Sequence, residues 1–251
     1  MSKAIIVPDL AYTSHTGRRG NGSSGGKELL ATLKYLQYRD DANGHIPQQQ
    51  GLERWQDRGL GQNYREILNS CHSLSSAKVL AWTWVISPAP DLMALVPQPE
   101  REALVKTLTE QIVEAYYEAR GVDVPRYSYV MHDRIAKPDD EGNSGLHQLH
   151  THVVLPGTTP TIAGEQLPFY NRANKGHVQL LRDIASEAFS VEMNQRVGIE
   201  WHELRPALQP TLQPELLLQP ALPELPPVVE WDGLSELDRW FGRRTPEREI
   251  E

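Results

Sequence analysis

Apolar residues recur at intervals of three or four positions in three segments, and this spacing gathers them on one face of a helix. The segments are residues 27–37, 100–119 and 177–197. Gly121 and Gly198 closely follow the last two segments, and glycine commonly ends helices because it adopts the left-handed conformation without strain. We therefore predict three helices, each with one buried face.

Short runs rich in β-branched and aromatic residues predict four strands, at residues 4–7, 79–87, 127–132 and 149–155. A polar, turn-rich insert separates the last two, which we expect to pair as an antiparallel hairpin. Residues 45–61 are polar, and their pattern assigns them to neither a helix nor a strand. The order of elements predicts an α+β fold in which a mainly antiparallel central sheet is flanked by helices.

The composition changes beyond residue 202. Leu-Gln-Pro occurs three times, and eight of the 19 prolines lie beyond residue 205. Proline at this density breaks both helix and sheet, so a Pro-rich C-terminal extension is predicted. We expect a folded domain at residues 1–202, a Pro/Leu/Gln-rich linker at 203–230 and a short amphipathic segment at 231–251.

Composition and charge limit the classes of function. The chain has no apolar run near the ~20 residues that span a bilayer, and its start lacks the pattern of a signal peptide, so a cytoplasmic protein is expected. A single cysteine, Cys71, excludes an internal disulfide framework and a cysteine-rich zinc site. The net charge of −8 disfavours a general nucleic-acid binder. Ten acidic and five basic residues from Glu203 onward contribute −5, which leaves −8 + 5 = −3 for the body and permits a local basic strip.

Four of the nine histidines lie between positions 132 and 152. His150 and His152 stand two apart on a predicted strand, so both side chains point to one face and can chelate one cation. Either His132, on the preceding strand, or His147, three residues upstream, supplies the third ligand. A lone strand histidine is usually a satisfied polar residue, but this density favours a metal site. Imidazoles suit Mn²⁺, Zn²⁺, Ni²⁺ or Co²⁺, and Mg²⁺ when a phosphate adds oxygens.

The segment Gln148-Leu-His-Thr-His-Val-Val154 resembles the metal-binding motif of conjugative and mobilisation relaxases, which belong to the HUH endonuclease superfamily. His132-Asp133 resembles the His-x-Asp opening of that motif in the mobilisation branch, although here Asp follows directly. The similarity covers roughly residues 1–200. It implies a relaxase-like palm, a divalent metal (Mn²⁺ or Mg²⁺ first, Zn²⁺ or Ni²⁺ as alternatives) and tyrosine-mediated nicking and joining of single-stranded DNA.

The resemblance also implies the nucleophile. Leu33-Lys-Tyr-Leu-Gln-Tyr-Arg39 resembles the family's first motif, so Tyr35 is expected to form a 5′-phosphotyrosine intermediate. Tyr38 lies one helical turn away and is the alternative. Tyrosines at this spacing are otherwise half-buried packing residues. Replication initiators of the same superfamily place the tyrosine after the histidines, and Tyr170 has that position here.

The expected partner is single-stranded DNA at the transfer origin of a plasmid or integrative element, with accessory mobilisation proteins recruited through the tail and no membrane. Arg18, Arg19 and Lys27 flank a glycine-serine loop, and Arg39 follows Tyr38; all four are candidate DNA contacts, although the loop is equally explained as a plain connector. Three alternatives stay open: a rolling-circle replication initiator or transposase using Tyr170, a non-catalytic DNA- or partner-binding module, and a metallohydrolase without a tyrosine.

Overall fold

The computed structural model describes residues 5–16, 25–43, 55–135, 146–160, 165–168 and 176–204. The chain divides into two units, residues 1–210 and 211–251, and every described element belongs to the first. Residues 205–251 lie outside the described residues, so the linker, the tail segment and the boundary at residue 202 stay predictions.

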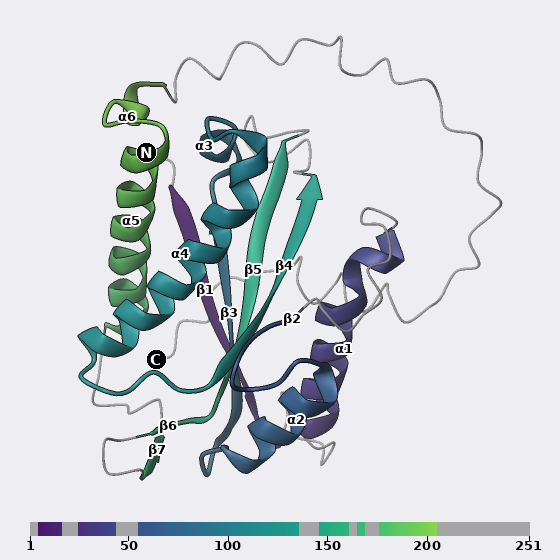
Figure 1. The fold of residues 1–251 in the computed structure, drawn as a ribbon. Helices are drawn as coiled ribbons and strands as arrows, with labels where there is room; N and C mark the ends of the chain where they lie inside the picture. Colours follow the sequence, from purple (N-terminus) through teal and green to yellow (C-terminus); the bar gives the residue numbers. More distant parts are fainter. Residues whose placement is uncertain are drawn as a thin grey trace, which may run out of the picture. The chain divides into compact units, whose positions relative to one another are not determined.

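A five-stranded antiparallel sheet forms the centre of the first unit (Figure 1). Its strands are β1 (Ile6–Ser14), β2 (Trp55–Arg58), β3 (Val79–Pro88), β4 (Tyr127–Ile135) and β5 (His147–Pro156). The order across the sheet is β1-β3-β5-β4-β2, which places β5 in the middle. Two short strands, β6 (Thr158–Pro160) and β7 (Gln166–Pro168), pair separately.

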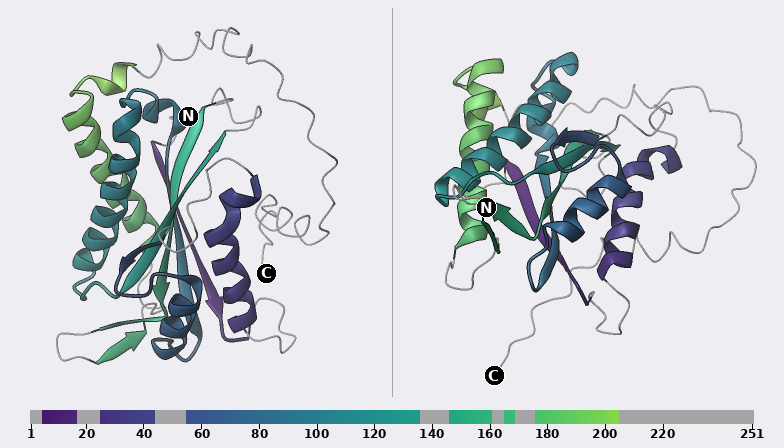
Figure 2. Two further views of the ribbon diagram at one scale, coloured as in Figure 1. Left: turned by 45° about the vertical axis from the view of Figure 1, so that its right-hand side comes forward. Right: turned by 60° about the horizontal axis from the view of Figure 1, so that its bottom comes forward.

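Helices cover both faces of this sheet, as the views in Figure 2 show. One face carries α4 (Gln98–Ala119) and α5 (His177–Arg196), and the other carries α1 (Gly25–Asn43) and α2 (Tyr64–Ser73). Two single-turn helices, α3 (Pro90–Met93) and α6 (Trp201–Leu204), complete the described elements. The predicted α+β fold with a mainly antiparallel, helix-flanked sheet is confirmed. In the described ranges, no helix combines the length and apolar character needed to cross a bilayer.

Alternation along β5 divides the core into two clusters. Val153 packs in the cluster that α4 and α5 cover, whereas Val154 packs in the cluster that α1 and α2 cover. The hydroxyl of Thr151 lies 2.7 Å from that of Thr109 on α4, which ties the odd-numbered positions of β5 to the first face. Since successive side chains of a strand point to opposite faces, His150 and His152 face α1 and α2.

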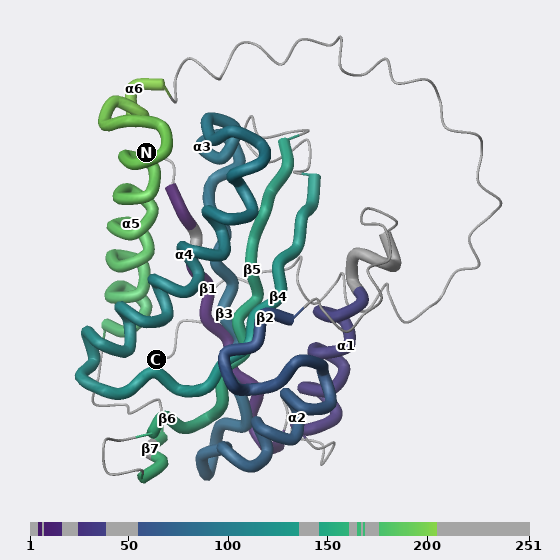
Figure 3. Tube along the Cα trace, viewed as in Figure 1, coloured from purple at the N-terminus to yellow at the C-terminus, as the bar shows by residue number. Residues whose placement is uncertain are grey.

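Strand β1 is longer than the pattern predicts, because it continues from residue 6 to residue 14 through Pro8 and Asp9. Both residues disfavour strand structure. β1 is an edge strand, however, and pairs only with β3, where Pro8 stands opposite Ile86. At an edge, the missing proline amide can face away from the sheet. Figure 3 shows β1 and β3 side by side, although two helices and a strand separate them in the sequence.

Helix α2 is absent from the sequence prediction, and its apolar face is short. Only Ile67 and Cys71 of the helix are fully buried. A capping signal does precede it: the side chain of Asn63 accepts hydrogen bonds from the backbone amides of Arg65 and Glu66, both at 3.1 Å. Asparagine at this position satisfies amides that the first helical turn leaves without a partner.

Candidate metal centre

The hairpin of β4 and β5 brings histidines from two strands together. The register places His132 directly opposite His150, and Val130 opposite His152. Side chains directly opposite or diagonal to one another on one face are close neighbours. The three histidines therefore form a compact group on the face of the sheet that α1 and α2 cover.

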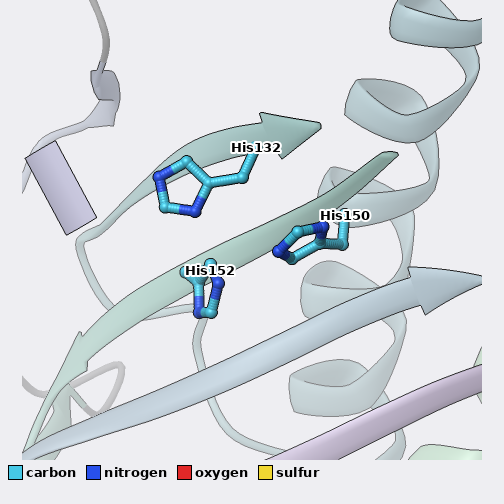
Figure 4. Close-up of side chains that lie close together, drawn as sticks. All are labelled: His132, His150 and His152. Atoms are coloured by element: carbon cyan, nitrogen blue, oxygen red, sulfur yellow. The ribbon is translucent and has the colours of Figure 1, made fainter. Parts of the chain in front are cut away.

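The three imidazoles lie close together and are buried (Figure 4). Their ring centroids are 5.0–5.7 Å apart, and each ring offers a nitrogen within 4.8 Å of the others. His132 is 1% exposed, His150 5% and His152 8%. Three nitrogens held about 2.1 Å from one ion lie about 3.0–3.4 Å apart, so small ring rotations bring this triad onto a single cation.

Backbone carbonyls orient two of the rings. The Nε2 atom of His132 lies 2.7 Å from the carbonyl oxygen of Leu36, and the Nδ1 atom of His150 lies 3.0 Å from that of Gln148. A carbonyl oxygen only accepts hydrogen bonds, so each of these ring nitrogens carries a hydrogen and is the donor. The lone pair of the neutral ring then lies on Nδ1 of His132 and on Nε2 of His150. Metal-ligating histidines typically donate their other N–H in this way.

Three imidazoles on a buried face fit a divalent cation. Nitrogen ligands of this kind suit Mn²⁺, Co²⁺, Ni²⁺ and Zn²⁺. The described residues supply three ligands, which leaves coordination positions for oxygen atoms of a substrate, as in catalytic metal sites.

His147, the other candidate for the third ligand, lies apart from this triad. It is an odd-numbered residue of β5, so its side chain leaves the opposite face of the sheet. The Nδ1 atom of His147 lies 2.7 Å from a carboxylate oxygen of Asp133, and its side chain is 60% exposed. The structure therefore brings His132, and not His147, to His150 and His152.

The two candidate tyrosines of the N-terminal helix lie on the turn of α1 that contacts the triad. Leu36, whose carbonyl receives the His132 hydrogen bond, stands between them. Tyr35 is half-buried and packs against the cluster beneath α1. Tyr38 is 44% exposed, and its ring centroid lies 6.3 Å from that of Tyr64. Tyr170 lies outside the described residues.

The predicted DNA-binding residues are placed only in part. Lys27 is exposed in the first turn of α1. It stands nine residues before Leu36, which is about 13 Å along the helix axis, so the structure does not bring it to the triad. Arg18, Arg19 and the side chain of Arg39 lie outside the part of the chain that the structure describes.

A polar row next to the triad was not recognised from the sequence. The Nε atom of Arg134 donates to Oε1 of Gln148 at 2.5 Å, and Nε2 of Gln148 donates to the hydroxyl of Ser87 at 2.9 Å. One signal was present, since Arg134 follows His132 by two positions and so shares its face. The predicted strand ended at residue 132, whereas β4 continues to residue 135.

The fold is similar to that of a conjugative relaxase. The model matches the metal-bound structure of the conjugative relaxase TrwC in complex with oriT DNA at a TM-score of 0.50 and 14% identity, over 75% of this chain and 70% of that chain. TrwC with a 27-mer DNA that comprises the recognition hairpin and the cleavage site gives 0.47 and 11%, over 75% and 69%. No protein-family model and no curated protein matches the sequence. The first likeness confirms the predicted relaxase-like fold.

Proposed function

We propose that the chain is a relaxase, a metal-dependent enzyme that nicks and rejoins single-stranded DNA at the transfer origin of a plasmid or integrative element. The observation that carries the proposal is the buried triad of His132, His150 and His152. It lies on a sheet whose fold is similar to that of a relaxase. Residues 203–230 are proposed as a linker, and residues 231–251 as the segment that recruits accessory mobilisation proteins.

The proposed cofactor is Mn²⁺ or Mg²⁺, with Zn²⁺ or Ni²⁺ as alternatives. When bound, a divalent cation polarises a phosphate and stabilises the negative charge that builds on its oxygens. The chain's own contribution is to hold the ligands. Leu36 and Gln148 fix the proton positions of His132 and His150 through their carbonyl oxygens, and all three rings are buried on one face of the sheet.

The proposed nucleophile is Tyr35, with Tyr38 as the alternative. The phenolate oxygen forms a bond to phosphorus, and the bond between phosphorus and the 3′ oxygen breaks. The departing 3′ oxygen takes up a proton, and the 5′ phosphate stays on the tyrosine. Attack by a 3′-hydroxyl reverses these steps and rejoins the strand, because the covalent intermediate conserves the bond energy.

The hydrogen bond between Leu36 and His132 supports the choice of this helix. It connects the backbone of α1, at the turn that carries both tyrosines, directly to a proposed metal ligand. Tyr35 and Tyr38 are three residues apart, so their side chains leave the helix about 60° from each other. A shift of α1 over the sheet would therefore move both phenols relative to the triad.

Formation of a covalent adduct tests the proposal. The protein is incubated in Mn²⁺ with 3′-labelled single-stranded oligonucleotides that share a randomised central segment, and adducts are recovered from a denaturing gel and sequenced. We expect an adduct with the natural chain. His150→Ala abolishes it, whereas His147→Ala, the matched control on the opposite face, retains it. Tyr35→Phe abolishes it if Tyr35 is the nucleophile.

The peptide that carries the DNA separates the alternatives. An adduct on Tyr38 identifies Tyr38, and not Tyr35, as the nucleophile. An adduct on Tyr170 indicates a replication initiator or transposase. A metal-loaded natural chain that forms no adduct with any sequence of the pool contradicts the relaxase proposal. Metal-dependent cleavage without an adduct indicates a metallohydrolase, and retention of DNA without cleavage indicates a binding module.

A further inference from the structure

A row of three polar side chains crosses the sheet beside the histidine triad. Arg134 on β4 stands directly opposite Gln148 on β5. Each lies two residues from a histidine of the triad, His132 or His150, and two residues of a strand span about 6.7 Å. Side chains two apart share a face, so the row and the triad face the same helices.

The row has a defined arrangement of donors and acceptors. The amide oxygen of Gln148 accepts from Nε of Arg134 at 2.5 Å, and the amide nitrogen of Gln148 donates to the hydroxyl of Ser87 at 2.9 Å. A single orientation of the amide satisfies both bonds, and Ser87 on β3 is buried. The bond uses only Nε of the guanidinium, which leaves four N–H donors on its two Nη atoms.

No acidic residue among those described neutralises this arginine. The neighbouring carboxylate, Asp133, points to the opposite face and pairs with His147 instead. Arg134 itself is exposed, in contrast to the buried triad. An exposed arginine held by a neutral amide adds little to stability. A fixed guanidinium with its charge retained is, however, well suited to a phosphate, because its planar fork matches two phosphate oxygens.

We propose that Arg134 binds the phosphate that flanks the scissile phosphate of the single-stranded DNA, and that Gln148 acts as its positioning residue. This inference rests on the proposed function, because it takes the triad as the place where the scissile phosphate is held. The row lies two residues along the strands from the triad, or about 6.7 Å. This spacing separates the two proposed phosphate sites along the DNA. Ser87 fixes Gln148 from the neighbouring strand.

The salt dependence of DNA binding tests the contact with Arg134. The probe is fluorescein-labelled oligothymidylate of 20 nucleotides, titrated with the full-length protein in Mn²⁺ at several salt concentrations. Each phosphate contact contributes about 0.7 to the slope of log K against log salt for single strands. We expect Arg134→Gln to lower this slope by about 0.7 and to weaken binding about tenfold at low salt. Arg182→Gln, at an exposed position of α5 on the other face, serves as the matched control and leaves both unchanged.

The role of Gln148 is tested by non-additivity. We expect Gln148→Leu to weaken binding less than Arg134→Gln does, and the double variant to bind no worse than Arg134→Gln alone, because Gln148 acts only through the arginine. Mn²⁺ binding by calorimetry stays within about twofold in all three, since none removes a ligand. An unchanged salt slope in Arg134→Gln, or additive losses in the double variant, overturns the inference.

The position of the contact is found with the sequence that the natural chain cleaves. Single phosphates of that oligonucleotide are replaced by uncharged methylphosphonates. Arg134→Gln should cause no further loss of binding when the replaced phosphate is the one next to the cleavage site. The assignment is overturned if Arg134→Gln causes no further loss of binding when the scissile phosphate is replaced. It is also overturned if Arg134→Gln weakens binding further at every replaced phosphate. If nothing is cleaved, the proposed function has failed, while the salt slope still reports on Arg134.

Discussion

Binding of a metal to the triad should stabilise the fold, and two histidines three positions apart test this directly. His150 belongs to the triad, and His147 lies on the other face of the same strand. A ligand that binds only the folded protein at 100 times its Kd adds about 2.7 kcal/mol to the free energy of unfolding. The unit that contains the site has 210 residues, and for such a domain each kcal/mol raises Tm by about 2–4 °C. A rise of about 5–10 °C is therefore expected.

The two variants should respond differently. Loss of one of three ligands lowers metal affinity at least as much as the roughly 100-fold change that loss of an outer hydrogen bond can cause. At the same metal concentration His150→Ala then gains only about 0.4 kcal/mol, which is a shift in Tm near 1 °C. His147→Ala removes a largely exposed pair with Asp133, which changes stability by less than about 1 kcal/mol. His147→Ala should therefore retain the full metal-dependent rise in Tm.

The assay is thermal unfolding followed by circular dichroism, after dialysis against a chelator and with Mn²⁺, Ni²⁺ or Zn²⁺ added back. A chelator added to the loaded protein should reverse the rise. The reasoning is refuted if none of these cations raises the Tm of the natural chain, or if His147→Ala abolishes the rise as completely as His150→Ala does.

Three further predictions concern the scaffold. Gly157→Ala should lower the free energy of unfolding by about 3 kcal/mol, because the added Cβ would lie 2.0 Å from the carbonyl oxygen of Val79; urea unfolding measures the loss, and an unchanged midpoint contradicts it. Thr151→Val should cost about 1 kcal/mol, because it removes one hydrogen bond to the hydroxyl of Thr109 while that hydroxyl still donates to the carbonyl of Val105. Replacing both threonines should cost less than the sum of the two single changes, as urea unfolding of the three variants can show. Burial raises the pKa of the Cys71 thiol to about 12, so the native protein should not react with Ellman's reagent at pH 8; denaturation should release one thiol, and rapid reaction of the native form would show that Cys71 is accessible.

Local patterns predicted the elements whose signals lie within their own residues. The long helices repeat apolar residues over several turns, and β3 is a run of β-branched and aromatic residues, so α4, α5 and β3 appear close to their expected bounds. Strand β1 and helix α2 depend on their surroundings. Pro8 is tolerated because β1 lies at an edge, and α2 has only two fully buried side chains. Neither an edge position nor a short buried face is apparent without the packed sheet.

The site divides in the same way. That His150 and His152 share a face follows from the sequence, because the alternation of a strand is a local property of its backbone. That His132 joins them does not follow, since a shift of one residue in the pairing of β4 and β5 would turn His132 to the other face. His147 is excluded only once β5 is known to begin at residue 147, because alternation then places it opposite His150. The register of the packed hairpin places His132 opposite His150. The carbonyl that orients His132 comes from a residue 96 positions away, and the arginine row joins three strands. The first contact exists only once α1 has packed on the sheet, and the row exists only once the three strands have paired, so tertiary structure alone decides both.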